Sequence, residues 1–456
     1  MGSQPTPTMV STMNTFAEEF PELALPATGE VFPNPQVLVL NEPLATELGL
    51  DPQWLRSPAG IDFLTGQGDC VALGYAGHQF GQFNPRMGDG RALLLSEHTD
   101  PHGKNWDIHA KGTGRTPFSR GGDGHYPLDA ALKEFAFAES LHALGVPTAR
   151  SLAVLTTGGT VPRRRLHPGA IGVRVASSHI RIGTFQYAAL LGPSVTDRLT
   201  RYALARHFPA GSSPFDLFDA TVARQAELVA HWMRFGFIHG VMNTDNVAIS
   251  GETIDFGPCA FMDYFSTDTV YSSIDTRGRY AYAQQPAVMM WNLARLAEAL
   301  VPLVDEGVKK FTERLQRYQP QYGAAWDKAM ATALGAEGCA EQLLGLLEVA
   351  APDYNALLAG LTPGEVPPGL EGIPGAAEWT ERWTALDPQP RNPIYLPRNH
   401  GLQAALVEAE QGDIGRYLLT LEALRNPYEW DDKYEKLGLH AAVPRAEAEF
   451  TTYCGT

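Results

Sequence analysis

Apolar and polar side chains alternate in short runs through the first part of the chain, a pattern with the period of a β-strand. In one run Trp106, Ile108 and Ala110 point to one face, and the polar residues between them point to the other. Such patterns, separated by glycine-containing loops, predict strands at residues 91–95, 107–111, 152–155 and 171–175.

Helical spacing of apolar residues appears first at residues 128–144, where Gly145 and Pro147 end the pattern. After Phe185 the pattern is mainly helical. We predict further helices at residues 41–50, 219–235 (ended by Gly236) and 402–410, with a Gly- and Pro-rich loop at residues 359–375.

The composition of the chain argues against several classes of function. The formal net charge of −16 argues against a surface that binds nucleic acid or an anionic membrane. No apolar run approaches the length of a membrane span, and the N-terminus lacks a basic-then-apolar signal pattern. The four widely spaced cysteines fit no zinc pattern and suit a reducing compartment, so we expect a cytoplasmic protein.

The segment HGVMNTDN, residues 239–246, is followed nine residues later by Asp255-Phe256-Gly257. It places an acid and an amide, Asp245 and Asn246, on one side of a predicted hairpin (residues 247–254) and a second acid on the other. Protein kinases use one such Asp near the acceptor hydroxyl and an Asn and a DFG Asp on metal. The adjacency of Asp245 and Asn246 and the missing His-Arg-Asp motif differ from ordinary kinases. The segment predicts binding of a nucleotide and Mg²⁺.

Glycine-rich stretches upstream supply candidate phosphate sites. Gly88 and Gly90 stand in a loop that opens a strand, where backbone amides approach phosphate oxygens closely, although an ordinary turn explains the loop as well. The segment KGTGRTPFSRGGDG, residues 111–124, combines three cations with five glycines. Lys111 ends a strand where the kinase β3 lysine would stand, and Glu134 follows on the helix as its expected partner.

Arg174 and Arg181 add positive charge to the same part of the chain. Each is flanked by aliphatic residues, so we expect both on the polar face of half-buried strands. Surface salt bridges are the common explanation for such arginines. Ordinary kinases handle the phosphates with about one lysine plus metal. This richer set suggests that more phosphate charge is held within the protein.

The order of strands, one helix, more strands and then helices predicts an α+β, protein-kinase-like fold with two lobes and additions at both ends. We expect the segments to be an N-terminal extension (1–70), a nucleotide-binding N-lobe (71–187), a C-lobe with the catalytic and metal loops (188–358) and a C-terminal helical extension (359–456).

Long motifs at consistent spacing give the chain a specific resemblance. They are YAGHQFGQFNPRMGDGRALLL, KGTGRTPFSRGGDG, HPGAIGVRVASSHIRIGTFQY and HGVMNTDNVAISGETIDFGPCAFMD, within about residues 75–265. The chain resembles the selenoprotein O (SelO/YdiU) family of pseudokinases. The resemblance implies a kinase-like fold that binds ATP in a flipped orientation and transfers AMP to Ser, Thr or Tyr hydroxyls of proteins. With the γ-phosphate pointing inward, the α-phosphate faces the acceptor and the buried end needs cations.

The resemblance also implies roles for individual residues. Asp245 matches the general base, and Asn246 and Asp255 match the ligands of Mg²⁺, with Mn²⁺ as the alternative metal. Cys454 matches a C-terminal selenocysteine position, so a disulfide with Cys259 that restrains the segment after Asp255 is a hypothesis. The implied nucleotide pocket comprises Gly88, Gly90, Arg91, Lys111, Asp123, Gly124, Arg174, Arg181 and Asp255, with Glu134 paired to Lys111.

Two alternatives to the adenylyltransferase remain at this stage. The literal Asp255-Phe256-Gly257 fits a conventional kinase, and a nucleotide-binding scaffold without chemistry is a third class. The expected partners are ATP, with UTP as the alternative nucleotide, and protein substrates with Ser, Thr or Tyr hydroxyls. We expect no nucleic acid and no membrane partner, and a monomer.

Overall fold

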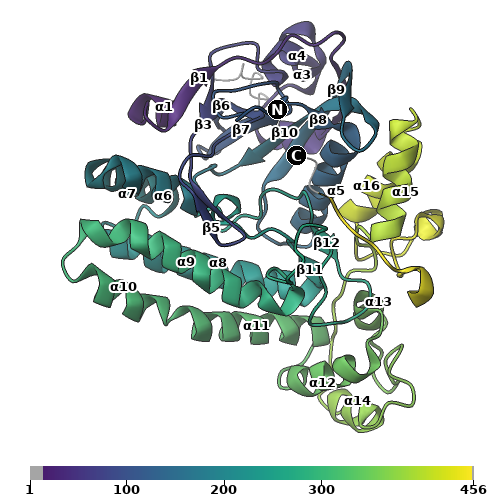
Figure 1. Cartoon of the computed structure of the whole chain (residues 1–456). Coiled ribbons are helices and arrows are strands. Elements are labelled where there is room, and N and C mark those ends of the chain that lie inside the picture. Colours follow the sequence, from purple (N-terminus) through teal and green to yellow (C-terminus); the bar gives the residue numbers. More distant parts are fainter. Residues whose placement is uncertain (1–13, 454–456) are drawn as a thin grey trace, which may run out of the picture.

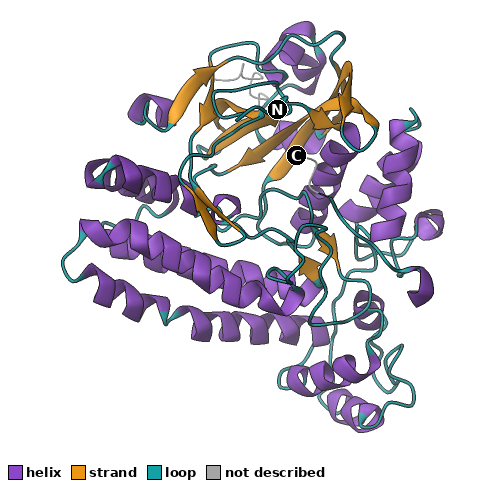
Figure 2. Ribbon diagram, viewed as in Figure 1, coloured by secondary structure: helices purple, strands orange, loops and turns teal. Residues whose placement is uncertain are grey.

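The computed structural model of the chain describes residues 14–453, in which an antiparallel sheet lies against a largely helical half (Figures 1 and 2). The strands are β1 (Ala24–Ala27), β2 (Gln36–Leu40), β3 (Cys70–Leu73), β4 (Gly77–Gln79), β5 (Gln82–Asn84), β6 (Ala92–Thr99), β7 (Asn105–Lys111), β8 (Tyr126–Pro127), β9 (Arg150–Pro162), β10 (Leu166–Ala176), β11 (Phe237–Ile238) and β12 (Ala260–Phe261).

The helices before the second half of the chain are α1 (Thr15–Glu19), α2 (Glu42–Glu47), α3 (Pro52–Arg56), α4 (Pro58–Leu64), α5 (Leu128–Ala143), α6 (Ile182–Leu191), α7 (Pro193–His207) and α8 (Pro214–Phe235), with a 3-10 turn η1 (Thr244–Asn246). Those that follow are α9 (Gln285–Leu300), α10 (Gly307–Leu315), α11 (Tyr318–Leu334), α12 (Ala340–Ala350), α13 (Tyr354–Ala359), α14 (Ala376–Thr384), α15 (Asn399–Glu410) and α16 (Gly415–Arg425). Short 3-10 turns complete the set: η2 (Tyr282–Gln284), η3 (Val301–Leu303), η4 (Asp432–Leu437) and η5 (Arg445–Glu447).

The main sheet has the strand order β1-β3-β6-β7-β10-β9-β2, with β8 paired to β10. Its alternating pattern directs the side chains of each strand to opposite faces. One face packs Ile108, Ile171 and Val173 against apolar residues of α2, α3 and α4. The other faces α5 and the helical half, where Leu132 and Phe135 join the main core. The polar residues of β7, Asp107, His109 and Lys111, therefore lie on the side of α5.

Helices α8, α9, α10 and α11 run alongside one another below the sheet, and α15 and α16 lie beside α5 (Figure 1). The Tyr417 hydroxyl of α16 donates to the Leu132 carbonyl oxygen of α5 at 2.7 Å, which fixes this contact. Within residues 14–453, no helix combines the length and the apolar character that crossing a membrane demands.

Most of the predicted elements are present, and several need correction. The strands at residues 91–95, 107–111, 152–155 and 171–175 and the helices at 128–144 and 219–235 are confirmed, although β9 and β10 are much longer than predicted. Strands β1 and β2 were not predicted, because their short runs lie among prolines, yet both pair into the main sheet. The hairpin after Asn246 is reduced to the isolated bridge between Val247 and Thr253. The helix predicted at 402–410 is followed by a further one, α16.

Candidate active site

A cavity of about 1280 Å³ is lined by residues of the main sheet, of α5 and of loops in the helical half. Every site residue predicted from the sequence lines it except Glu134, which stands behind Lys111. The lining members are Gly88, Gly90, Arg91, Lys111, Asp123, Gly124, Arg174, Arg181, Asp245, Asn246 and Asp255. The structure thus brings together residues that lie far apart in the sequence, from Gly88 to Asp255.

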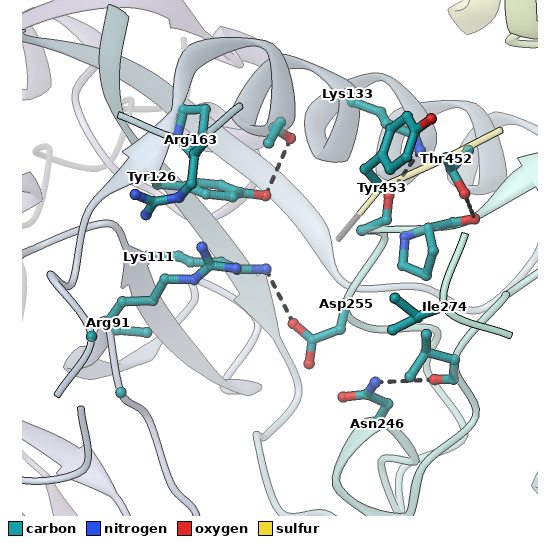
Figure 3. Close-up of a pocket in the computed structure, with 18 of the residues that line it drawn as sticks. Arg91, Lys111, Tyr126, Lys133, Arg163, Asn246, Asp255, Ile274, Thr452 and Tyr453 are labelled. Atoms are coloured by element: carbon teal, nitrogen blue, oxygen red, sulfur yellow. Dashed lines mark hydrogen bonds and ion pairs between the residues drawn. The ribbon is translucent and has the colours of Figure 1, made fainter. Parts of the chain in front are cut away.

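Lys111 and Arg174 are brought together by the sheet, because β7 and β10 are neighbours that pair Lys111 with Gly172. The Lys111 Nζ donates to Glu134 Oε2 at 2.9 Å, as predicted, and lies 3.3 Å from Asp255 Oδ1 (Figure 3). Arg174 Nη1 lies 2.9 Å from Asp255 Oδ1 and 3.6 Å from Glu134 Oε1. Two cations and two carboxylates therefore form one network that links the sheet, α5 and the loop that carries Asp255.

The backbone of Asp255 has a strained conformation. Its φ of +62° lies in the left-handed region, which a residue other than glycine adopts at a cost. Burial opposes its ionisation, but Arg174, Lys111 and Arg181 outweigh this and lower the pKa of Asp255 well below its ordinary value. Only Oδ1 is engaged by Lys111 and Arg174, so Oδ2 keeps its lone pairs for another ligand.

Arg181 reaches the cavity from a different local structure than predicted. It is the N-cap residue of α6. Its backbone forms an isolated β-bridge with Ala248 and is not part of a strand. Its side chain is 1% exposed, and its guanidinium lies 4.4 Å from the centre of the Tyr75 ring. Asp89 Oδ1 lies 3.7 Å from Arg181 Nη2. Ile180 and Ile182, on either side of Arg181, are both buried in the main core. They fix the position of the Arg181 backbone at the start of α6.

Asp89 is a member of the site that sequence reasoning missed. It is almost completely buried, accepts from the Leu73 backbone N–H at 3.2 Å and pairs with His109 Nε2 at 2.9 Å. Burial opposes its charge, yet His109 and the nearby arginines lower its pKa to below the ordinary range. The signal available in the sequence was its place between Gly88 and Gly90 at the mouth of a strand.

Tyr126 is the second residue that sequence reasoning missed. Its hydroxyl donates to Glu134 Oε2 at 2.8 Å, and its ring lies 4.8 Å from the Arg91 guanidinium and 5.0 Å from Lys111 Nζ. The ring therefore supports both cations at the floor of the cavity (Figure 3). Its position directly before the helix that carries Glu134 was the only hint in the sequence.

The glycine-rich stretches lie at the wall of the cavity. Gly88 has a φ of +120°, and a Cβ there would meet the Phe118 ring at 2.5 Å, so the close approach of the two loops requires glycine. Asp123 lines the cavity next to Gly124, but both of its oxygens accept from Arg163, at 2.6 and 2.9 Å. This bidentate pair outweighs burial, which opposes ionisation, and lowers the pKa of Asp123 to about 2.

Asp245 stands in η1 and lines the cavity. It is 7% exposed, and its Oδ1 has no hydrogen-bond partner among the described residues. Burial, together with the charge of Asp255, raises the pKa of Asp245 to about 6. A carboxylate of this kind accepts a proton near neutral pH, which is the property of a general base.

Asn246 is oriented by its neighbours. Its Nδ2 donates to the Val241 carbonyl oxygen at 3.0 Å, which leaves Oδ1 of the same amide for another ligand. Asn246 Oδ1 and Asp255 Oδ2 are hard oxygen donors that line one cavity, and oxygen donors are the ligands that Mg²⁺ and Mn²⁺ prefer. The donor set therefore fits a divalent cation of this class.

Two histidines near these loops are engaged by hydrogen bonds outside the proposed reaction. His239 Nε2 lies 2.9 Å from the Ile254 carbonyl oxygen, and its backbone N–H donates to Gln285 Oε1 at 3.0 Å. His78 Nδ1 lies 2.9 Å from the Gln186 amide nitrogen. Neither contacts Asp245.

The end of the described chain forms another wall of the cavity. Thr452 Oγ1 donates to the Pro258 carbonyl oxygen at 2.8 Å, and Tyr453 covers the Arg164 guanidinium at 3.7 Å (Figure 3). Cys259 is buried, and burial raises the pKa of its thiol to about 12. Cys454 lies outside the described residues, so the disulfide with Cys259 stays a hypothesis.

Two comparisons relate the chain to known proteins. The profile of a family described as "Protein adenylyltransferase SelO" matches residues 6–362. The chain is 47% identical to the protein nucleotidyltransferase YdiU of Mycolicibacterium smegmatis over 481 aligned positions, which cover 98% of each chain. It is 45% identical to the protein of the same name from Corynebacterium efficiens, over 97% of this chain and 95% of the relative.

Proposed function

The chain belongs to the protein adenylyltransferase SelO family, and from this premise we propose that it transfers AMP from ATP to Ser, Thr or Tyr hydroxyls of proteins. Its two halves then act as the lobes of a protein-kinase-like fold, with residues 71–187 holding phosphates and residues 188–358 carrying the catalytic and metal loops. Residues 1–70 and 359–456 are additions to this frame.

The observation that carries the proposal is the buried pair of arginines. Arg174 and Arg181 both line the cavity while their side chains are only 6% and 1% exposed, and Lys111 lies beside them. Asp255, Glu134 and Asp89 lie beside these cations and offset the cost of burying them, and the planar guanidinium groups suit the β- and γ-phosphates of an inward-pointing ATP. The α-phosphate then faces the acceptor, which is the flipped orientation.

Asp245 accepts the proton of the acceptor hydroxyl in this mechanism. The hydroxyl oxygen attacks the α-phosphorus and forms a new P–O bond, while the bond from that phosphorus to the bridging oxygen breaks. Pyrophosphate leaves with the electron pair of that bond, and Lys111, Arg174 and Arg181 bind its charge. The pKa of about 6 keeps Asp245 ionised at neutral pH and still basic enough to take the proton.

Asn246 and Asp255 hold a divalent cation in the proposed complex, with Mg²⁺ as the first candidate and Mn²⁺ as the alternative. The bound cation offsets negative charge on the phosphates. Lys111 and Arg174 hold Oδ1 of Asp255, so that Oδ2 faces the cavity as the metal-binding atom. In the same way, the hydrogen bond from Asn246 Nδ2 to the Val241 carbonyl oxygen orients the amide and leaves its Oδ1 for the cation.

A conventional kinase is the second candidate, and Asp255-Phe256-Gly257 is the feature that favours it. The released product distinguishes the two reactions, because AMP transfer yields pyrophosphate and phosphoryl transfer yields ADP. We expect pyrophosphate to form with ATP, Mg²⁺ and casein as a generic acceptor. Asp245→Asn should lower the rate by about 100-fold or more, as expected for loss of a general base. ADP as the main product would overturn the proposal, and binding of ATP without either product would favour a scaffold.

A further inference from the structure

The hairpin β4–β5 lies beside Asp245, Gln79 and Phe80 of this hairpin line the cavity, and an arginine that forms no ion pair within residues 14–453 stands at each of its ends. Resting on the proposed AMP transfer, we propose that the preferred acceptor is a hydroxyl residue flanked by Asp or Glu, whose carboxylates are bound by Arg120 and Arg279. Neither arginine has a role in the mechanism above.

The hairpin lies directly against the proposed base. Gly77 of β4 pairs with Asn84 of β5, and a Cβ on Gly77 would lie 2.4 Å from Asp245 Oδ1. The backbone N–H of His78 donates to Thr244 Oγ1 at 2.8 Å, one residue before Asp245. An acceptor whose hydroxyl reaches Asp245 would therefore lie close to this hairpin.

Two further contacts fix the hairpin turn. The backbone N–H of Phe80 donates to Asn243 Oδ1 at 3.0 Å, and the Tyr280 hydroxyl donates to the same oxygen at 2.6 Å. The Phe80 and Tyr280 rings lie 5.1 Å apart. The turn is thus joined both to the loop of Asp245 and to the segment that carries Arg279.

Arg120 stands at the end of the hairpin that is nearer to Asp245. With the Asn84 amide oxygen turned towards it, Arg120 Nη1 donates to that oxygen at 2.9 Å. Its side chain is exposed, and it lines the same cavity as Asp245. Since Asn84 is paired with Gly77, Arg120 is one strand away from the residue that contacts Asp245.

Arg279 stands at the turn of the hairpin. Its guanidinium carbon lies 3.6 Å from the position of a Cβ on Gly81, and it stacks on the Trp291 ring at 4.8 Å. The buried Asp275 carboxylate accepts from the backbone N–H groups of Arg279 and Tyr280, at 2.9 and 2.7 Å. These contacts hold the Arg279 backbone and leave its charge for a ligand.

Within residues 14–453, neither of these two arginines forms an ion pair. This contrasts with Arg295, which also lies over the Trp291 ring, at 4.9 Å, and is paired with Glu298 at 2.7 Å. The contrast is marked in a chain with a net charge of −16, which offers acids in excess. Unpaired arginines on both ends of a hairpin beside the base match a segment with carboxylates on both sides of the acceptor.

The backbone of the hairpin offers a further contact to an extended segment. Strand β5 pairs only with β4 in the part of the chain that the structure describes, so its outer edge has free N–H and C=O groups. Residues 81–83 on this edge are exposed. An acceptor segment that adds alongside β5 would place its alternate side chains near Arg120 and Arg279.

The test uses the full-length protein with ATP labelled at the α-phosphate, Mg²⁺ and three synthetic peptides. Each peptide carries one Tyr flanked on both sides by Glu, by Gln or by Lys in an otherwise identical sequence. We expect kcat/KM for the Glu peptide to exceed that for the Gln peptide by about fivefold, as for two partly exposed ion pairs, with the Lys peptide lowest. The preference should shrink between 20 mM and 500 mM salt, because screening shortens the reach of exposed charges.

The variants Arg120→Gln and Arg279→Gln identify the site. Each should reduce the Glu-to-Gln ratio, and the double variant should bring it close to one. Arg201→Gln is the matched control, because Arg201 is an exposed arginine of α7 that pairs with Asp197 at 2.8 Å; it should keep the wild-type ratio. Equal labelling of all peptides, or a ratio unchanged in the double variant, would overturn the acidic-acceptor proposal and leave AMP transfer intact. Absence of label from every peptide and from casein would instead contradict the proposed function itself.

Discussion

At the scale of single residues, the site is arranged so that neighbouring carboxylates have opposite tendencies to ionise. Arg174 and Lys111 hold Asp255 ionised, whereas Asp245 is buried without a cation at hydrogen-bond distance and its pKa is raised to about 6. A permanently charged ligand for a cation and a proton acceptor near neutral pH are the two properties that the proposed reaction requires.

Asp245 sets the pH dependence that we predict. Only its ionised form accepts the proton, and its pKa is raised from 3.8 to about 6, so kcat should fall tenfold per pH unit below about pH 6. The measurement is the rate of AMP incorporation from pH 4.5 to 8.5 at saturating ATP. A rate that stays constant down to pH 4.5 would show that no group with a raised pKa acts as the base.

The burial of Asp245 also lowers the stability of the folded protein at pH values at which this carboxyl group is ionised. Because its pKa is raised in the folded state, the protein binds this proton more tightly than the unfolded chain does, and ionisation above pH 6 costs about 2 to 3 kcal/mol. Asp245→Asn removes that charge, so it should raise the Tm at pH 8 although it removes activity. The gain should shrink as the pH falls to 4, where Asp245 of the wild type is protonated as well. A lower Tm for the variant at pH 8 would contradict this account, and differential scanning fluorimetry at both pH values is the measurement.

The sequence supported most of the individual site residues for a physical reason. Lys111, Arg174 and Asp255 stand in local patterns that combine charge with a strand or turn, and such patterns are visible in one dimension. Asp89 and Tyr126 became visible only in three dimensions, because their role depends on His109 and Glu134, residues 20 and 8 positions away. The spacing of these residues along the sequence does not predict that their side chains are in contact.

At the scale of elements, the hairpin β4–β5 and the turn η1 form one unit around Asp245. The Gly77 backbone packs directly on the Asp245 carboxylate, and Gly183 of α6 packs on the Asp245 Cα at 3.2 Å from its would-be Cβ. Such close approach depends on the absence of side chains at both glycines. The unit was not predicted, because the β4 and β5 strands are only three residues long and their partner loop lies far along the chain.

Gly77→Ala tests this unit. The new Cβ would lie 2.4 Å from Asp245 Oδ1 and 2.6 Å from Met87 Sδ, so the carboxylate must move. We expect kcat to fall by about 100-fold, the effect of displacing a catalytic group by roughly 1 Å. The measurement is AMP incorporation together with circular dichroism, which reports whether the fold is kept.

Gly323→Ala is the matched control for that substitution. Gly323 lies within α11, and a Cβ there meets no atom within 4 Å. Activity should stay at the wild-type level and stability should rise by up to about 1 kcal/mol, because alanine favours the helix. Equal activity of the Gly77 variant and this control would show that the hairpin does not position Asp245.

At the scale of the whole molecule, the sheet, α5 and the helical half meet in a single charged network. Lys111 of the sheet contacts both Glu134 of α5 and Asp255 of the loop in the helical half, so one ion-pair network joins the proposed phosphate-binding and metal-binding sides. The α+β class and the order of strands and helices could be predicted from periodicity. The pairing of β1 and β2 into the sheet, and the packing of α16 on α5, could not, because they are long-range contacts of short or amphipathic segments.

The central claim is that the α-phosphate of ATP, and not the γ-phosphate, is transferred. The most direct measurement compares labelling of an acceptor protein from ATP that carries its label at the α- or at the γ-phosphate, with Mg²⁺ present and Asp255→Ala as the control. We predict label from the α position only, and its loss in the variant. Label from the γ position only would make this protein a kinase and would contradict the role given to Arg174 and Arg181.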